Sequence, residues 1–107
     1  MKTLIETYLS EQGIPTEPYK VQFLRFTTKI YRDENGDCCV EFPKWNFNCP
    51  PPSFTPQEIE NELKQEYIDS YSDGINVKYA EDEITKQSKL NELTALTSLE
   101  DIKDYTY

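Results

Sequence analysis

Three consecutive prolines, Pro50 to Pro52, interrupt the chain near its middle and fix the backbone there. Consecutive prolines hold an extended polyproline II conformation that makes no internal hydrogen bonds. The residues that follow, Thr55-Pro56-Gln57-Glu58, form a capping box with proline at the first helical position. The sequence therefore predicts an extended connector that leads directly into a helix at Thr55.

The length of 107 residues allows one domain, spanning residues 1–107, with a hairpin-containing half at 1–54 and an acidic helical half at 55–107. A chain of this size buries roughly two-thirds of its unfolded surface. Apolar residues make up only 36%, the mean hydropathy is −0.77, and 13% of the residues are aromatic. We therefore expect a thin, aromatic-rich core and a C-terminal part that is loosely docked.

The first half alternates between helical and extended patterns. Apolar spacing predicts a helix over Thr3–Gln12, and the aromatic and β-branched residues of Tyr19–Tyr31 predict a strand. Apolar parity switches at Phe23-Leu24, which indicates a bulge or burial on both faces. The Asn-Gly pair within Asp33–Asp37 favours a tight turn, and Cys38–Phe42 returns as the second strand of an antiparallel hairpin.

The second half is expected to be mainly helical. The helix that starts at Thr55 should end at Asp73-Gly74, followed by a short edge strand over Ile75–Tyr79. A further helix is expected at about Ala80–Leu96, and the capping signature Thr97–Asp101 should open a short last helix. The predicted fold class is α+β: an antiparallel β-hairpin or three-stranded sheet with two to four helices packed on one side.

The sequence lacks the residues that several kinds of catalytic and metal-binding chemistry require. The chain has no His, so it cannot form a Ser-His-Asp or Cys-His relay. Three thiols, two of them adjacent, make a poor zinc site, and three glycines cannot supply a phosphate loop. We expect no enzyme, no cofactor, no bound metal and no catalytic residue. The residues concerned are Cys38, Cys39, Cys49, Gly13, Gly36 and Gly74.

Charge is distributed unevenly. Residues 1–54 carry six Lys/Arg and seven Asp/Glu, whereas residues 55–107 carry five Lys and thirteen Asp/Glu, so most of the net charge of −9 lies in the second half. Direct nucleic-acid binding is therefore not expected. The acidic residues fall near one side of the helix after Thr55, and this face either imitates the phosphates of a duplex or is simply solvated. They are Glu58, Glu62, Glu66, Asp69 and Asp73.

Two other segments place aromatic residues beside features used in binding. Aromatics flank the proline run and could present a rigid surface to a protein partner, or pack the connector onto the sheet. The candidate partner-binding residues there are Trp45, Phe47, Pro51 and Phe54. Basic residues alternate with aromatics in the predicted long strand, a weak signal for single-stranded nucleic acid. They are Lys20, Arg25, Lys29 and Arg32.

The run Lys44-Trp45-Asn46-Phe47, followed by Pro50-Pro51-Pro52-Ser53 and a helix opening with Glu58-Ile59-Glu60, resembles a family of small proteins encoded among phage tail genes. The similarity covers about thirty residues between Phe42 and Tyr71, with an echo in Leu90-Asn91-Glu92-Leu93 and Thr97–Ile102. The chain departs from the pattern by an inserted Phe54 and a longer N-terminal strand. The resemblance implies a virus-encoded, non-enzymatic virion or assembly protein.

Two functional hypotheses follow. The first is a phage-encoded virion or tail-assembly accessory protein that contacts other virion proteins, and a homo-oligomer is compatible with it. The alternative is an acidic phage-encoded inhibitor of a host nucleic-acid-binding defence protein, of anti-CRISPR or anti-restriction type. The charged start Met1–Glu6 does not look like a signal peptide, and no membrane association is expected. We expect the protein in the host cytoplasm and in the virion.

Overall fold

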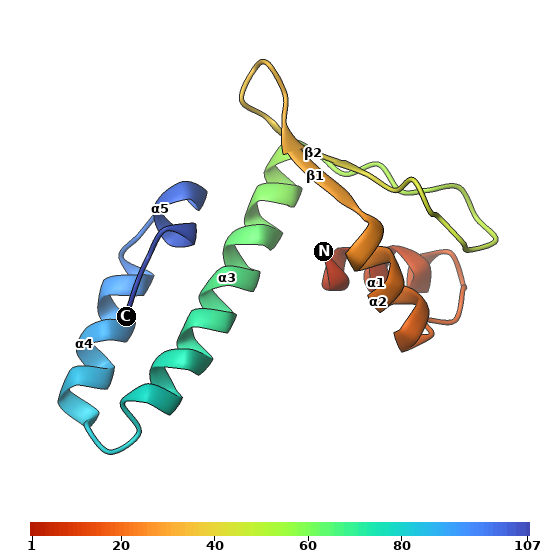
Figure 1. Ribbon diagram of the computed structural model, residues 1–107. Coiled ribbons are helices and arrows are strands. Elements are labelled where there is room, and N and C mark those ends of the chain that lie inside the picture. Colours follow the sequence, from red (N-terminus) through yellow and green to blue (C-terminus); the bar gives the residue numbers. More distant parts are fainter. The chain divides into compact units, whose positions relative to one another are not determined.

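The computed structural model describes residues 1–107 and has an α+β fold of five helices and one two-stranded antiparallel hairpin (Figure 1). The chain divides into two compact units, Met1–Glu62 and Leu63–Tyr107, which are described in turn. That the whole chain forms one domain stays a prediction. The elements are α1 (Lys2–Glu11), α2 (Pro18–Thr27), β1 (Lys29–Arg32), β2 (Cys38–Glu41), α3 (Pro56–Lys78), α4 (Glu83–Thr94) and α5 (Leu99–Lys103).

Helix α2 corrects the largest error of the sequence analysis, because Tyr19–Tyr31 was expected to be a strand. Pro18 occupies the start of the helix, where its fixed φ suits helical geometry and its missing N–H costs nothing. The change of apolar parity at Phe23-Leu24 is explained by a helical period, not by a bulge. Only the end of the segment is extended, as β1, and the helix stops at Thr28, whose backbone is in the β region.

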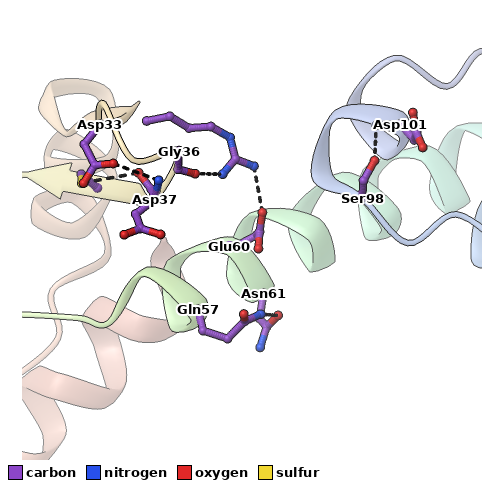
Figure 2. A network of polar contacts seen from close by, with 10 residues as sticks. Asp33, Gly36, Asp37, Gln57, Glu60, Asn61, Ser98 and Asp101 are labelled. Carbon is purple, nitrogen blue, oxygen red and sulfur yellow. Dashed lines mark hydrogen bonds and ion pairs between the residues drawn. The ribbon is translucent and has the colours of Figure 1, made fainter.

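The hairpin is confirmed, with Lys29 opposite Glu41 and Arg32 opposite Cys38. Its turn is longer than a two-residue Asn-Gly turn: five residues lie between the strands, and only Gly36 has a positive φ, +81°. The Asp33 carboxylate accepts hydrogen bonds from the backbone N–H groups of Asn35 (2.9 Å) and Asp37 (3.0 Å), which holds the loop closed (Figure 2).

The hairpin contacts helix α3 through one ion pair. The Arg32 guanidinium donates to Gly36 O at 2.7 Å and to the Glu60 carboxylate at 2.8 Å, so one side chain links the turn, β1 and α3 (Figure 2). The capping box that was predicted to open α3 is confirmed: Thr55 N–H donates to Glu58 Oε1 at 3.1 Å, and Glu58 N–H donates to Thr55 Oγ1 at 3.2 Å.

Helix α3 runs to Lys78, so the predicted stop at Asp73-Gly74 and the predicted strand over Ile75–Tyr79 are both wrong. Gly74 sits inside the helix, where a methyl group in place of its hydrogen would lie 1.8 Å from Tyr107 Oη. The glycine therefore marks a close approach between two parts of the chain and not the end of a helix.

The second unit places α4 and α5 beside the later part of α3, and both helices have side-chain caps. Asp82 accepts from Thr85 N–H at 3.0 Å at the start of α4. Ser98 accepts from Asp101 N–H at 3.1 Å at the start of α5, as the sequence signature predicted (Figure 2). Helix α4 begins later than the expected Ala80, because Asp82 caps it, and it ends at Thr94, two residues before the expected Leu96.

The core is aliphatic, which corrects the expectation of an aromatic-rich core. None of the fourteen Phe, Tyr and Trp side chains is fully buried. The side chains that are almost completely inaccessible are Ile5, Leu9, Val21, Leu24, Ile59, Ile75, Leu93 and Ile102. In the second unit, eight partly buried Tyr, Ile and Leu side chains in all pack around Ile75, Leu93 and Ile102. None of the helices has the length and apolar character needed to cross a bilayer.

Candidate protein-binding surface

Helix α2 has two apolar faces of different character. Val21 and Leu24, three residues apart, are buried. Tyr19, Phe23 and Phe26 follow the i, i+4, i+7 spacing of one helix face and are all exposed. At 100° per residue, this second set points away from the buried pair. We call Tyr19, Phe23 and Phe26 the aromatic stripe.

The exposure of the stripe is large for side chains of this type. Phe26 is 81% exposed, Tyr19 69% and Phe23 49%, and the next strand adds exposed Ile30 and Tyr31. Isolated exposed apolar residues are common on soluble proteins. Three aromatic rings in register on one helix face make an apolar surface of the kind that marks contact with another molecule.

The Trp45 segment forms contacts inside its own unit. The Trp45 ring lies 6.1 Å from Tyr8, 5.5 Å from Phe42 and 5.3 Å from Phe47, measured between ring centroids. Its Nε1–H donates to Cys49 O at 2.7 Å. These contacts account for both the ring and the polar edge of Trp45, so packing explains this residue without a partner.

The other candidate residues around the proline run extend the same cluster. Phe54 packs edge-on against Phe42 at 6.4 Å, and Lys20 lies 5.7 Å from the centre of the Phe47 ring. Tyr8 Oη donates to Pro50 O, which fastens the proline run to α1. Of the four candidates only Pro51 is exposed, whereas Trp45, Phe47 and Phe54 are half-buried. Their role in binding stays a prediction.

The acidic residues of α3 do not form one free surface. Glu58 closes the helix cap, and the half-buried Glu62 lies 3.9 Å from the Met1 amino group. Burial lowers the pKa of that amino group to about 6, more strongly than the Glu62 carboxylate raises it. Asp69 accepts from the Gln65 amide at 2.8 Å.

Asp73 is exposed and Glu66 is half-buried, so the five acidic candidates differ in surroundings. One of them, Glu58, stabilises the fold directly through the helix cap, and Glu62 lies beside the Met1 amino group. A role of the set in imitating nucleic acid stays a prediction.

One cysteine, Cys39, is less reactive than an ordinary thiol. All three cysteines are free, with Cys38 buried and the other two half-buried. Burial, followed by the negative charge of Asp33, raises the pKa of the Cys39 thiol. Because the thiolate is the reactive form, both effects make Cys39 a weaker nucleophile than an ordinary cysteine. No group of three or more Cys, Asp or Glu residues is arranged to hold a metal ion.

Two shallow depressions border α1. One, of about 180 Å³, lies between α1 and α2 beside Lys2, Glu6 and Arg25, and the other, of about 220 Å³, lies beside Tyr8 and Phe54. Small-molecule sites usually have volumes of about 300–1,000 Å³ and an enclosed apolar lining. The aromatic stripe is therefore the surface with the clearest chemical signature of binding.

Comparison with protein-family models, curated protein sequences and solved structures finds no match for this chain. The aromatic stripe was not among the residues singled out from the sequence. A signal for it was present: Pro18 begins the segment, and its aromatics recur at helical spacing. The strand preference of aromatic and β-branched residues obscured that spacing.

Proposed function

We propose that this protein is a non-enzymatic binding protein that acts through protein–protein contacts, and that the aromatic stripe on α2 is its main contact surface. The observation that carries the proposal is the exposure of Tyr19, Phe23 and Phe26 on one helix face, opposite the buried Val21 and Leu24. Aromatic residues of this kind provide a large part of the binding energy of protein interfaces.

The class of partner comes from the resemblance of the Phe42–Tyr71 region to small proteins encoded among phage tail genes. We propose a virion or tail-assembly accessory role, with other virion proteins as partners. The competing hypothesis is an acidic inhibitor that imitates nucleic acid. It rests on the net charge of −9 and predicts contacts through carboxylates.

A pull-down from phage-infected cells, at low and high salt, tests both hypotheses. We expect tail, neck or capsid proteins to be recovered, to remain bound at high salt, and to be lost with a Phe23→Ser/Phe26→Ser variant. Gln22→Ser, at an exposed polar position of the same helix, is the matched control and should retain them.

The opposite result has a different pattern. Recovery of a nuclease that is released by salt, competed by DNA and lost on neutralising Glu58, Glu62 and Glu66 would support the inhibitor and reject the stripe as the contact surface. Circular dichroism of each variant should first show an unchanged helix content, because Glu58 also closes the cap of α3 and Glu62 packs beside the Met1 amino group.

A further inference from the structure

The large exposed apolar side chains fall into two groups. The first lies in the α2–β1 segment and includes the aromatic stripe. The second lies on either side of the connection between α3 and α4, where Val77 is 79% exposed and Ile84 86%. The seven residues are Tyr19, Phe23, Phe26, Ile30, Tyr31, Val77 and Ile84.

The two groups have opposite charge. The segment Pro18–Arg32 contains four basic residues and no acidic one, although the chain as a whole carries −9. Asp73–Ile84 contains four acidic residues and one lysine. That lysine, Lys78, donates to the main-chain oxygen of Tyr107 at 2.7 Å. We call the exposed residues from Val77 to Ile84 the acidic turn.

Charges in both places are available to a partner. In the basic segment Lys20 pairs with Glu17 and Arg32 with Glu60, so Arg25 and Lys29 remain without a carboxylate partner. Both are exposed. In the acidic turn Asp82 caps α4 and Glu83 pairs with Lys86. Glu81, which is exposed, takes part in neither interaction.

We propose that a second copy of this chain occupies the aromatic stripe, docking through its acidic turn. The inference rests on the proposed function, since it uses the same stripe, and adds the identity of an occupant. Apolar side chains would meet aromatic rings, while Arg25 and Lys29 of one copy face the carboxylates of the other. Such charge complementarity favours the correct pairing and opposes wrong ones.

Charge also argues against a stripe-to-stripe dimer, which would bring the basic segments of two copies together. A stripe-to-turn contact joins two different surfaces, so a bound pair still offers one free stripe, on one copy, and one free turn, on the other. Head-to-tail contacts of this kind produce closed rings or open filaments. The proposal therefore predicts assemblies whose size increases with protein concentration.

Complementation between two variants tests this arrangement. The stripe variant is Phe23→Ser/Phe26→Ser, and the turn variant is Val77→Ser/Ile84→Ser. In sedimentation velocity the unmodified protein should associate at high micromolar concentration, and each variant alone should associate at least ~100-fold more weakly. Mixed together they should form a 1:1 dimer that cannot grow, through the one intact stripe and the one intact turn.

Charge reversal gives a second measurement. Lys29→Glu should weaken association, and Glu81→Lys on the other copy should restore it in the mixture. Gln22→Ser and Asn76→Ser, at exposed polar positions next to the two surfaces, are the matched controls and should associate normally. If a double variant fails to fold, Phe26→Ser and Ile84→Ser alone address the most exposed residue of each group.

Two results would overturn the inference. One is a monomer at every concentration; the other is self-association of the turn variant equal to that of the unmodified protein, which would indicate contact between stripes. Capture of virion proteins is a separate readout. If the turn variant still captures them while the stripe variant does not, the proposed function stands although the second copy is rejected.

Discussion

Gly74→Ala gives a specific prediction about the fold, because the added methyl group favours the helix but clashes with Tyr107. Replacing glycine by alanine inside a helix normally stabilises the helix by about 1 kcal/mol. At Gly74 the new methyl group would lie 1.8 Å from Tyr107 Oη and 2.5 Å from its Cζ, so the Tyr107 ring must leave its place. Gly74→Ala therefore gains helix propensity and loses the contacts of Tyr107.

The loss can be worked out from those contacts. The Tyr107 ring packs edge-on against Tyr71 at 6.1 Å, worth about 0.5–1.5 kcal/mol. Its main-chain oxygen accepts from Lys78 Nζ and Tyr79 Oη, both at 2.7 Å, and each such hydrogen bond contributes about 1 kcal/mol. Losing the ring contact and one of these hydrogen bonds costs about 2 kcal/mol, so Gly74→Ala should destabilise the protein by about 1 kcal/mol overall.

A double-mutant cycle isolates this contact. In a Tyr107→Ala background the clash is absent, so Gly74→Ala should instead stabilise the protein by about 1 kcal/mol, giving a coupling energy of about 2 kcal/mol. Urea unfolding followed by far-ultraviolet circular dichroism measures all four free energies. Asn76→Ala, an exposed position in the same helix, is the control and should have the same effect in both backgrounds. Additivity of Gly74→Ala and Tyr107→Ala within about 0.5 kcal/mol would refute the reasoning.

Two further predictions concern other aromatic residues. Trp45→Ala removes a half-buried ring with three aromatic neighbours and an indole hydrogen bond. It should therefore lower the free energy of unfolding, measured by urea titration, by about 2–4 kcal/mol. A change below about 0.5 kcal/mol would instead favour a binding role for Trp45. Burial, helped by the Glu92 carboxylate, raises the pKa of Tyr105 to about 12. The folded state therefore holds this proton more tightly than the unfolded state, so stability present below pH 10 should fall between about pH 10 and 12. Tyr105→Phe should flatten that part of the pH profile, and an unchanged profile would contradict the assignment.

Sequence signals succeeded where the deciding interactions are local. Asn35-Gly36 marked the hairpin, although the turn is longer than predicted. Thr55 and Glu58 marked the start of α3, and Ser98 marked the start of α5. In each case the donor and acceptor lie within a few residues of one another. Spacing alone was therefore enough to indicate the hydrogen bond that forms.

The failures have the opposite cause. The sequence predicts a helix stop at Gly74, because nothing near this glycine indicates its real role. Its close contact is with Tyr107, thirty-three positions away in the sequence. The α2 segment was interpreted as a strand, because residues typical of strands outweighed Pro18 and the helical spacing. Three of the four candidates in the proline region, Trp45, Phe47 and Phe54, lie in a packed aromatic cluster. Their closeness in the sequence does not show what they pack against.

The aromatic stripe could have been inferred from the amount of core that the chain can build. A helix with apolar residues on both faces needs neighbours on both sides, and a chain of 107 residues with only 36% apolar residues has few neighbours to offer. The aliphatic side chains Val21 and Leu24 occupy the buried face of α2, which leaves Tyr19, Phe23 and Phe26 on the other. Exposing three rings on one face lowers solubility unless another molecule covers them. Part of the aromatic content that predicts an aromatic core therefore lies on the exposed face of α2.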